Sequence, residues 1–97
     1  MNAESVKGRN CGIRIVVLHR GWVVVGRVRR SDDVVVITDA SVIHRWGTAE
    51  GLGELRNGPT DRTILHYAGT VRVHPLAVVL EIDCDSAAWD KVLVNHG

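Results

Sequence analysis

The chain has 97 residues, enough for one small domain and too few for a two-lobed enzyme, an α/β barrel or a complete dinucleotide-binding fold. A formal net charge of +1, from 12 basic and 11 acidic residues, gives no general attraction to nucleic acid or to anionic lipid. Valine occurs 17 times and phenylalanine is absent. Because valine favours extended backbone, this composition predicts a mainly β protein.

After a polar segment, residues 1–12, that we expect to be a flexible arm, extended segments follow one another along the chain. The expected strands are residues 13–19, 21–29, 33–38, 70–73 and 76–83, with the third resuming over 42–46 after a break or kink at 39–41. Gly26 indicates a bulge or sharp bend inside the second strand. Unbroken valine runs indicate strands that are covered on both faces. The sequence therefore predicts one domain over residues 13–84, a small five-stranded SH3-like barrel.

The C-terminal segment, residues 85–97, has two interpretations. It can form a short helix capped by Asp85 or Ser86, with Trp89, Val92 and Leu93 on one face. It can also be a strand or a tail, since its last apolar residues favour extended backbone. We expect the helix.

Cys11 and Cys84 have neither the spacing of a zinc site nor that of a disulfide scaffold. If the first and last strands pair, the two cysteines become neighbours, and in a reducing cytosol we expect free thiols. The chain shows no secretory leader and no apolar run approaching the roughly 20 residues of a membrane span. We therefore expect a soluble cytoplasmic protein with no membrane partner.

Residues 44–69 form the expected long loop of the barrel, and long loops in small domains are usually functional or disordered. Within it we expect a short helix that is capped by Thr48 and runs through Arg56, with Leu52 and Leu55 facing inward. Glycines at 51 and 53 indicate that backbone approaches a strand or a ligand closely there. The alternative is a glycine-rich connector that only covers the end of the barrel.

The polar side chains of this loop suit an anionic, partly aromatic ligand. Guanidinium groups can pair with phosphates, an indole can stack on a ring, and neutral side chains can add hydrogen bonds. The predicted ligand-binding residues are Arg45, Trp46, Thr48, Arg56, Asn57, Thr60, Arg62 and Thr63. Two alternatives stay open: the indole plugs the barrel end, and the arginines pair with Glu50, Glu54 and Asp61.

Motifs for metal binding and catalysis are not found. The five histidines have no metal-ligand spacing, and no serine lies in a nucleophile elbow. Gly51 and Gly53 imitate part of a dinucleotide fingerprint, but Arg56 occupies its last position and no βαβ unit surrounds it. We expect no catalytic residue, no metal and no cofactor.

Over residues 13–43 and 69–83 the order of strands, glycines and turns resembles an Sm-like barrel. This resemblance implies a homo-oligomeric ring that binds RNA. The chain departs from that pattern where RNA binding is located, because valines (34–36) replace an expected asparagine and His74-Pro75 replaces an Arg-Gly turn. The resemblance thus favours a barrel and a homo-oligomer, and the departures make nucleic acid a possible but less favoured partner.

A closer resemblance is to a family of small phage and prophage proteins. It is carried by RGWVVVG (Arg20–Gly26), DASVIHRWGTAEGLGEL (Asp39–Leu55), NGPTDRTIL (Asn57–Leu65) and GTVRVH (Gly69–His74). It implies a phage accessory protein acting in the host cytoplasm.

The resulting hypothesis is a non-enzymatic protein that binds a small phosphorylated ligand and sequesters a nucleotide signal of host immunity, which is an anti-defence role. The alternatives are an Sm-like RNA binder and a protein-interaction or structural phage protein.

Overall fold

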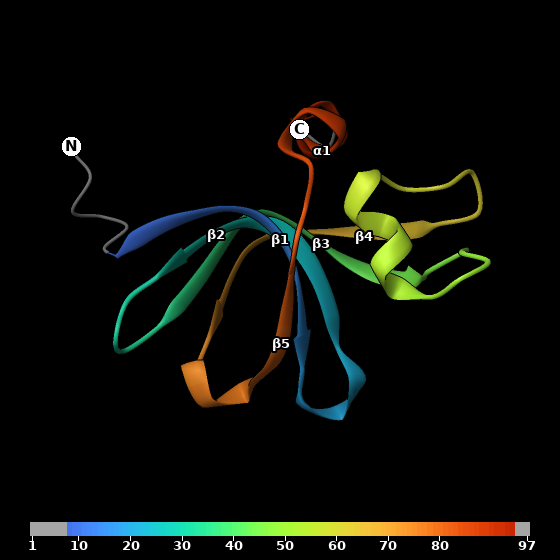
Figure 1. Ribbon diagram of the computed structural model, residues 1–97. Helices are drawn as coiled ribbons and strands as arrows, with labels where there is room; N and C mark the ends of the chain where they lie inside the picture. Colours follow the sequence, from blue (N-terminus) through green and yellow to red (C-terminus); the bar gives the residue numbers. More distant parts are fainter. Residues whose placement is uncertain (1–7, 95–97) are drawn as a thin grey trace.

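Five antiparallel strands form one curved sheet in the order β4-β3-β2-β1-β5, as the computed structural model shows for the described residues, 8–94 (Figure 1). This confirms the expected mainly β, five-stranded, barrel-like fold. The strands are β1 (Arg9–Leu18), β2 (Val23–Arg30), β3 (Val35–Arg45), β4 (Ile64–Val73) and β5 (Val78–Asp83). Short 3-10 turns lie between them, namely η2 (His19–Gly21), η3 (Leu52–Asn57) and η4 (Pro75–Ala77), and one α-helix, α1 (Ser86–Val94), ends the described chain.

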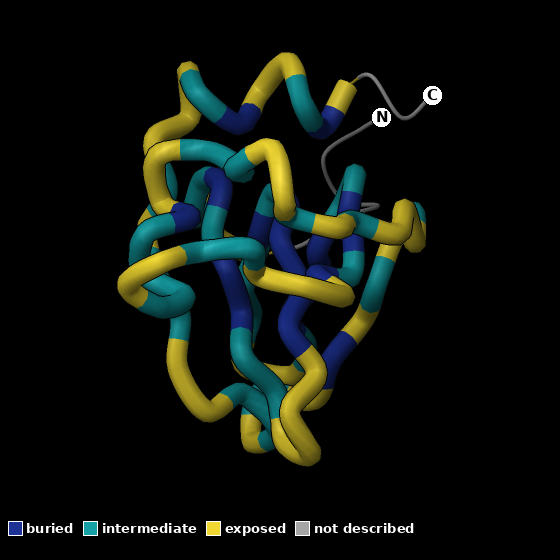
Figure 2. Tube along the Cα trace, turned by 90° about the vertical axis from the view of Figure 1, so that its right-hand side faces the viewer, coloured by how far each residue is buried: buried dark blue, intermediate teal, exposed yellow. Residues whose placement is uncertain are grey.

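The three central strands β1, β2 and β3 are buried on both faces along much of their length, and this explains their unbroken valine runs. Successive residues of one strand enter different hydrophobic clusters: Ile15 belongs to an outer cluster that α1 and η3 cover, whereas Val16 belongs to an inner cluster. Val25 and Val24 of β2 divide in the same way. Buried residues concentrate in β1, β2 and β3, whereas β4 and β5 carry many exposed residues. Figure 2 shows the buried stretches in the interior of the molecule.

Gly26 marks the bend of β2, as expected. The register with β3 shifts between Val25 and Arg27, and a Cβ atom on Gly26 would lie 2.5 Å from Ile37 Cγ2 and 2.9 Å from the Thr38 carbonyl oxygen. Only glycine allows β2 and β3 to approach this closely. In β3 the expected interruption is a kink within one continuous strand, where Asp39 takes a positive φ of 49°.

The C-terminal helix is confirmed as α1. Asp85 caps it, because its carboxylate accepts a hydrogen bond from the Ala87 amide at 3.0 Å. Trp89 and Leu93 are buried in the outer cluster, and Val92 packs against it. The indole Nε1 of Trp89 donates to the Leu55 carbonyl at 2.8 Å, which joins α1 to η3.

Several predicted boundaries are wrong. The first strand begins at Arg9, so residues 9–12 belong to the sheet and not to a flexible arm, because they pair with the end of β2. The fourth strand begins at Ile64 rather than at residue 70, because it pairs with β3 over its full length. The long loop is therefore residues 46–63 instead of 44–69. Predictions for residues 1–7 and 95–97 lie outside the described residues.

β1 and β5 pair antiparallel, as expected, and the Cys84 amide donates to the Ile13 carbonyl at 3.1 Å. The two cysteines are free and their side chains pack separately, Cys11 against the inner cluster and Cys84 against the outer one. Burial raises the pKa of the Cys84 thiol to about 11. This thiol therefore stays protonated at neutral pH and is a poor nucleophile.

Candidate functional site

The long loop folds around the 3-10 turn η3, whose Leu55 is fully buried beneath α1. The expected helix from Thr48 is wrong: the turn begins at Leu52, and Gly51 precedes it with a φ of 106°. Thr48 was expected to cap the helix, but the side chain that binds backbone amides here is that of Glu54. Its carboxylate accepts hydrogen bonds from the Ala49 and Glu50 amides at 3.2 and 3.1 Å.

The two arms of the loop are fastened together by threonine side chains. The Thr60 hydroxyl donates to the Gly47 carbonyl at 2.7 Å, and the Thr63 hydroxyl donates to the Trp46 carbonyl at 2.7 Å. The Thr63 hydroxyl also accepts from the Thr60 amide at 2.8 Å. These hydroxyl protons are therefore committed to the loop, although the sequence suggested Thr60 and Thr63 as ligand donors.

The sequence suggested close backbone approach at Gly51 and Gly53. Within the protein it occurs at Gly47 instead. A Cβ atom on Gly51 or Gly53 would meet no atom within 4 Å. On Gly47 it would lie 2.4 Å from the Arg62 carbonyl carbon, and the φ of Gly47 is 67°. Contact between the loop arms thus requires glycine at this position.

Replacing Gly47 with alanine should lower the free energy of unfolding by about 2–4 kcal/mol, through the clash and the left-handed backbone together. Gly53→Ala is the matched control, because Gly53 has open space and a negative φ; we expect a change within about 0.5 kcal/mol. Urea denaturation measures both variants. Equal stability of the two would mean that the arms do not touch.

A recess of about 460 Å³ lies between the fastened arms, and we call it the loop pocket. It brings together four of the eight predicted ligand residues. Its lining is Arg45, Gly47, Thr48, Ala49, Glu54, Thr60, Asp61 and Arg62. Arg45, Thr48, Thr60 and Arg62 are the predicted residues among these eight, and the assignment of a ligand to this recess stays a prediction.

The other four predicted residues lie outside the lining. Thr63 fastens the loop as described, and Asn57 is an exposed residue at the end of η3. The Arg56 guanidinium donates to the Gly53 carbonyl at 3.2 Å, and its own carbonyl accepts from the Asp85 amide at 2.8 Å. Arg56 therefore connects η3 to the start of α1.

Trp46 does not plug the barrel. Its side chain is 43% exposed and belongs to neither hydrophobic cluster, whereas Trp89 fills the outer core. The chain neighbours of Trp46, Arg45 and Gly47, both line the loop pocket. Trp46 is therefore an exposed indole that is next to the pocket in the chain but outside its lining.

The guanidinium groups of Arg45 and Arg62 make no ion pair within residues 8–94. The expected alternative partners therefore do not neutralise them, although Glu54 and Asp61 also line the pocket. Two guanidinium groups and two carboxylates give the lining a formal charge of zero. Such a lining favours a ligand that carries both an anionic group and hydrogen-bond donors.

Metal ligands do not gather in the described part of the chain: no three His, Cys, Asp or Glu side chains come close enough to hold an ion. His44 and His66 stack with ring centroids 5.0 Å apart. None of the helices within residues 8–94 has the length and apolar character needed to cross a bilayer.

A second recess, which the sequence did not indicate, lies beside the N-terminal end of α1 and includes Arg27, Arg29 and Thr38. Its residues come from four separate elements, so no local motif marks it. The only signal in the sequence was Gly12, where β1 carries a bulge.

Neither a scan against protein-family models nor a search of curated proteins gives a match to this chain. The resemblances to phage proteins and to Sm-like barrels therefore stay predictions.

Proposed function

We propose that the loop pocket binds a small phosphorylated ligand of the nucleotide type, and that the protein holds this ligand without converting it. The observation that carries the proposal is the presence of two unpaired guanidinium groups, those of Arg45 and Arg62, in one recess. A guanidinium group presents a planar fork of donors that matches phosphate oxygens. The threonine hydrogen bonds and the Gly47 contact fix the loop before any ligand arrives, which lowers the entropy cost of binding.

The carboxylates of the pocket narrow the ligand class. A bare oxyanion would be repelled by Glu54 and Asp61 as well as attracted by the arginines. A nucleotide meets both charges, because its phosphate can face the guanidinium groups while sugar hydroxyls or base amino groups donate to the carboxylates. Its ring can stack on Trp46, and such stacking contributes about 1–3 kcal/mol per base.

The biological role that we attach to this ligand is the capture of a nucleotide signal of host immunity. The resemblance to phage proteins supports this role. Sequestration needs only binding, and the pocket offers donors, acceptors and a stacking surface.

A thermal-shift assay against mononucleotides, cyclic oligonucleotides and ADP-ribose derivatives tests the proposal. A ligand at a hundred times its Kd should stabilise the protein by about 2.7 kcal/mol, which raises Tm by several degrees. Arg45→Gln and Arg62→Gln should each weaken binding about tenfold or more, because each loses a charge-assisted hydrogen bond. Their Tm without ligand should be unchanged, since neither side chain is paired.

Arg20→Gln, on the exposed turn η2, is the matched control and should bind like the unmodified protein. Absence of stabilisation by every nucleotide at millimolar concentration would overturn the proposal. If the Arg45 and Arg62 variants bound the nucleotide as tightly as the unmodified protein, the assignment of the ligand to the loop pocket would be overturned.

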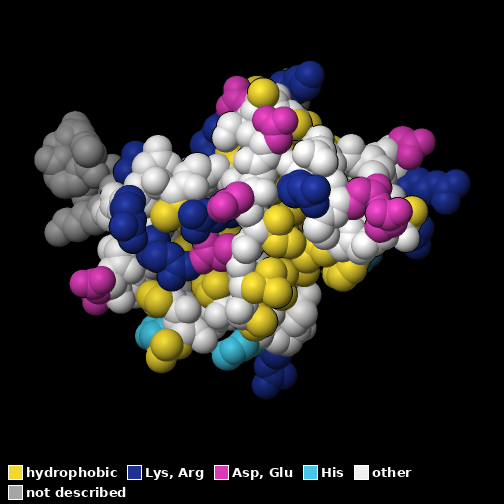
Figure 3. Space-filling view, in the orientation of Figure 1, with side chains coloured by type: hydrophobic (Ala, Val, Ile, Leu, Met, Phe, Trp, Pro, Cys, Tyr) yellow, Lys and Arg dark blue, Asp and Glu magenta, His cyan; other side chains and the backbone are white. Residues whose placement is uncertain are grey.

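A separate observation supports the expected homo-oligomer. Hydrophobic side chains gather over β5 and the turn before it (Figure 3), where Leu76, Val79 and Leu80 are exposed, Leu76 by 80%. β5 and β4 are the two edges of the sheet. We propose that the β5 edge of one copy pairs with the β4 edge of another, which covers this patch.

Sedimentation equilibrium tests this self-association. The unmodified protein should form an oligomer, and Val79→Lys on β5 should shift it towards the monomer. A monomer at all concentrations up to about a hundred micromolar would contradict it.

A further inference from the structure

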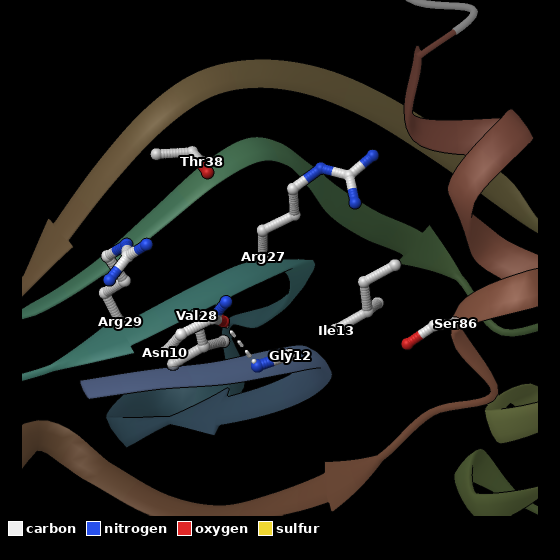
Figure 4. A pocket seen from close by; sticks show the side chains of 8 residues that line it. All are labelled: Asn10, Gly12, Ile13, Arg27, Val28, Arg29, Thr38 and Ser86. Atoms are coloured by element: carbon white, nitrogen blue, oxygen red, sulfur yellow. Dashed lines mark hydrogen bonds between the residues drawn. The ribbon is translucent and has the colours of Figure 1, made fainter. Parts of the chain in front are cut away.

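The second recess is a trough of about 370 Å³ between the N-terminal end of α1 and the outer face of the sheet (Figure 4). It is lined by Asn10, Gly12, Ile13, Arg27, Val28, Arg29, Thr38 and Ser86. No residue of the loop pocket contributes to it. The trough is therefore a recess distinct from the loop pocket.

The polar lining of the trough offers many hydrogen-bond donors and no carboxylate. It contains two guanidinium groups, one amide and two hydroxyls. The hydroxyls of Thr38 and Ser86 make no side-chain hydrogen bond within the described part of the chain. Figure 4 shows Thr38 on β3, Arg27 and Arg29 on β2, and Ser86 at the start of α1, placed around the trough.

The two arginines of the trough have different roles. Arg27 is held by two carboxylates, with Nε 3.0 Å from Asp39 and Nη2 2.7 Å from Asp90, and it thereby ties α1 to the sheet. These partners raise the pKa of Arg27 and neutralise its charge. Arg29 makes no ion pair among residues 8–94, and only a long hydrogen bond of 3.4 Å joins it to the Gly8 carbonyl. Arg29 thus supplies the uncompensated positive charge.

The bulge of β1 shapes the floor of the trough and orients Asn10. The Asn10 Oδ1 atom accepts from the Gly12 amide at 2.9 Å, so its NH₂ group remains a donor. A Cβ atom on Gly12 would meet no protein atom within 4 Å, and the floor is therefore open above this residue. Bulges often lie next to binding sites because they redirect side chains in this way.

We infer that the trough is a second binding site, for a phosphate-bearing anion. Arg29 provides the charge and the donor fork, while Asn10, Thr38 and Ser86 provide neutral donors. Asp85 accepts from the amides of Ala87, Ala88 and Trp89 in the first turn of α1, so the proposed site depends mainly on side chains and not on the helix end. The volume exceeds that of an inorganic phosphate ion, and it leaves room for a diphosphate or a small phosphate ester.

A pyrophosphate titration followed by amide NMR, at constant ionic strength held with chloride, tests this site. We expect saturable shifts at Gly12, Arg29, Thr38 and Ser86. Arg29→Gln should weaken pyrophosphate binding about tenfold or more, and Arg29→Lys should restore it only in part because lysine lacks the fork. Since Arg29 makes no ion pair, the Tm of these variants should not change.

Arg45→Gln is the control that separates the two sites, and it should leave the trough shifts unchanged. Equal pyrophosphate affinity in the unmodified protein and in Arg29→Gln would overturn the inference, as would shifts that chloride alone reproduces. Loss of nucleotide binding in the loop pocket would not affect it, so the two proposals fail separately.

Discussion

Trp89→Ala should destabilise the protein more than any other single side-chain truncation, by about 3–5 kcal/mol. The indole is fully buried in the outer cluster, so its removal leaves a cavity beneath α1. It also leaves the Leu55 carbonyl without the donor that joins η3 to α1. Because small domains are stable by only about 5–15 kcal/mol, much of the variant should be unfolded at physiological temperature.

Trp89→Phe separates the two contributions, because phenylalanine keeps most of the packing and loses only the hydrogen bond to Leu55. We expect an intermediate loss of about 1–3 kcal/mol. Trp22→Ala is the control for aromatic truncation, since Trp22 is 58% exposed and should change stability little. Urea denaturation measures all three variants, and equal losses in the Trp89 and Trp22 alanine variants would contradict the assigned core.

Glu81→Gln should produce the second large effect, a loss of about 2 kcal/mol in the free energy of unfolding. The Glu81 side chain is only 13% exposed. One carboxylate oxygen lies 2.6 Å from Arg14 Nη1, and the other contacts Arg30. Removal of its charge leaves two guanidinium groups facing each other in a partly buried position. This expected loss is smaller than the loss caused by breaking a fully buried ion pair, because both arginines keep some solvent contact.

Asp83→Asn is the matched control for this ion-pair cluster. Asp83 Oδ1 lies 2.8 Å from Arg14 Nε, at an angle that makes an ion pair without a hydrogen bond, and its side chain is almost fully exposed. Exposed pairs contribute little, so its loss should be within the error of a thermal melt. A Glu81 variant as stable as the Asp83 variant would show that the buried carboxylate is not needed.

The fold could be predicted largely because its signals are local. Valine runs indicated strands covered on both faces, and the inner and outer clusters show this arrangement. Gly26 indicated the bend. The errors lie in segments whose secondary structure depends on a neighbouring strand. Residues 9–12 and 64–69 carry weak strand signals, and they become strands because β2 and β3 pair with them.

The candidate site could be predicted only in part, for a similar reason. Arg45 ends β3 just before the loop and Arg62 lies in its second arm, and their proximity in the sequence to glycines and threonines was visible. The role of Thr63 was missed, because its hydroxyl meets the carbonyl of Trp46, 17 positions away. The trough was missed altogether, since its lining comes from β1, β2, β3 and α1 and is complete only when α1 folds onto the sheet.

Amide and indole NMR of the protein, titrated with the nucleotide that gives the largest thermal shift, tests the central claim most directly. Binding in the loop pocket predicts shifts at the Trp46 indole and at the amides of residues 45–49 and 60–63, with the trough residues unaffected. An unchanged Trp46 indole, together with shifts that lie elsewhere or are missing at millimolar ligand, would contradict the account.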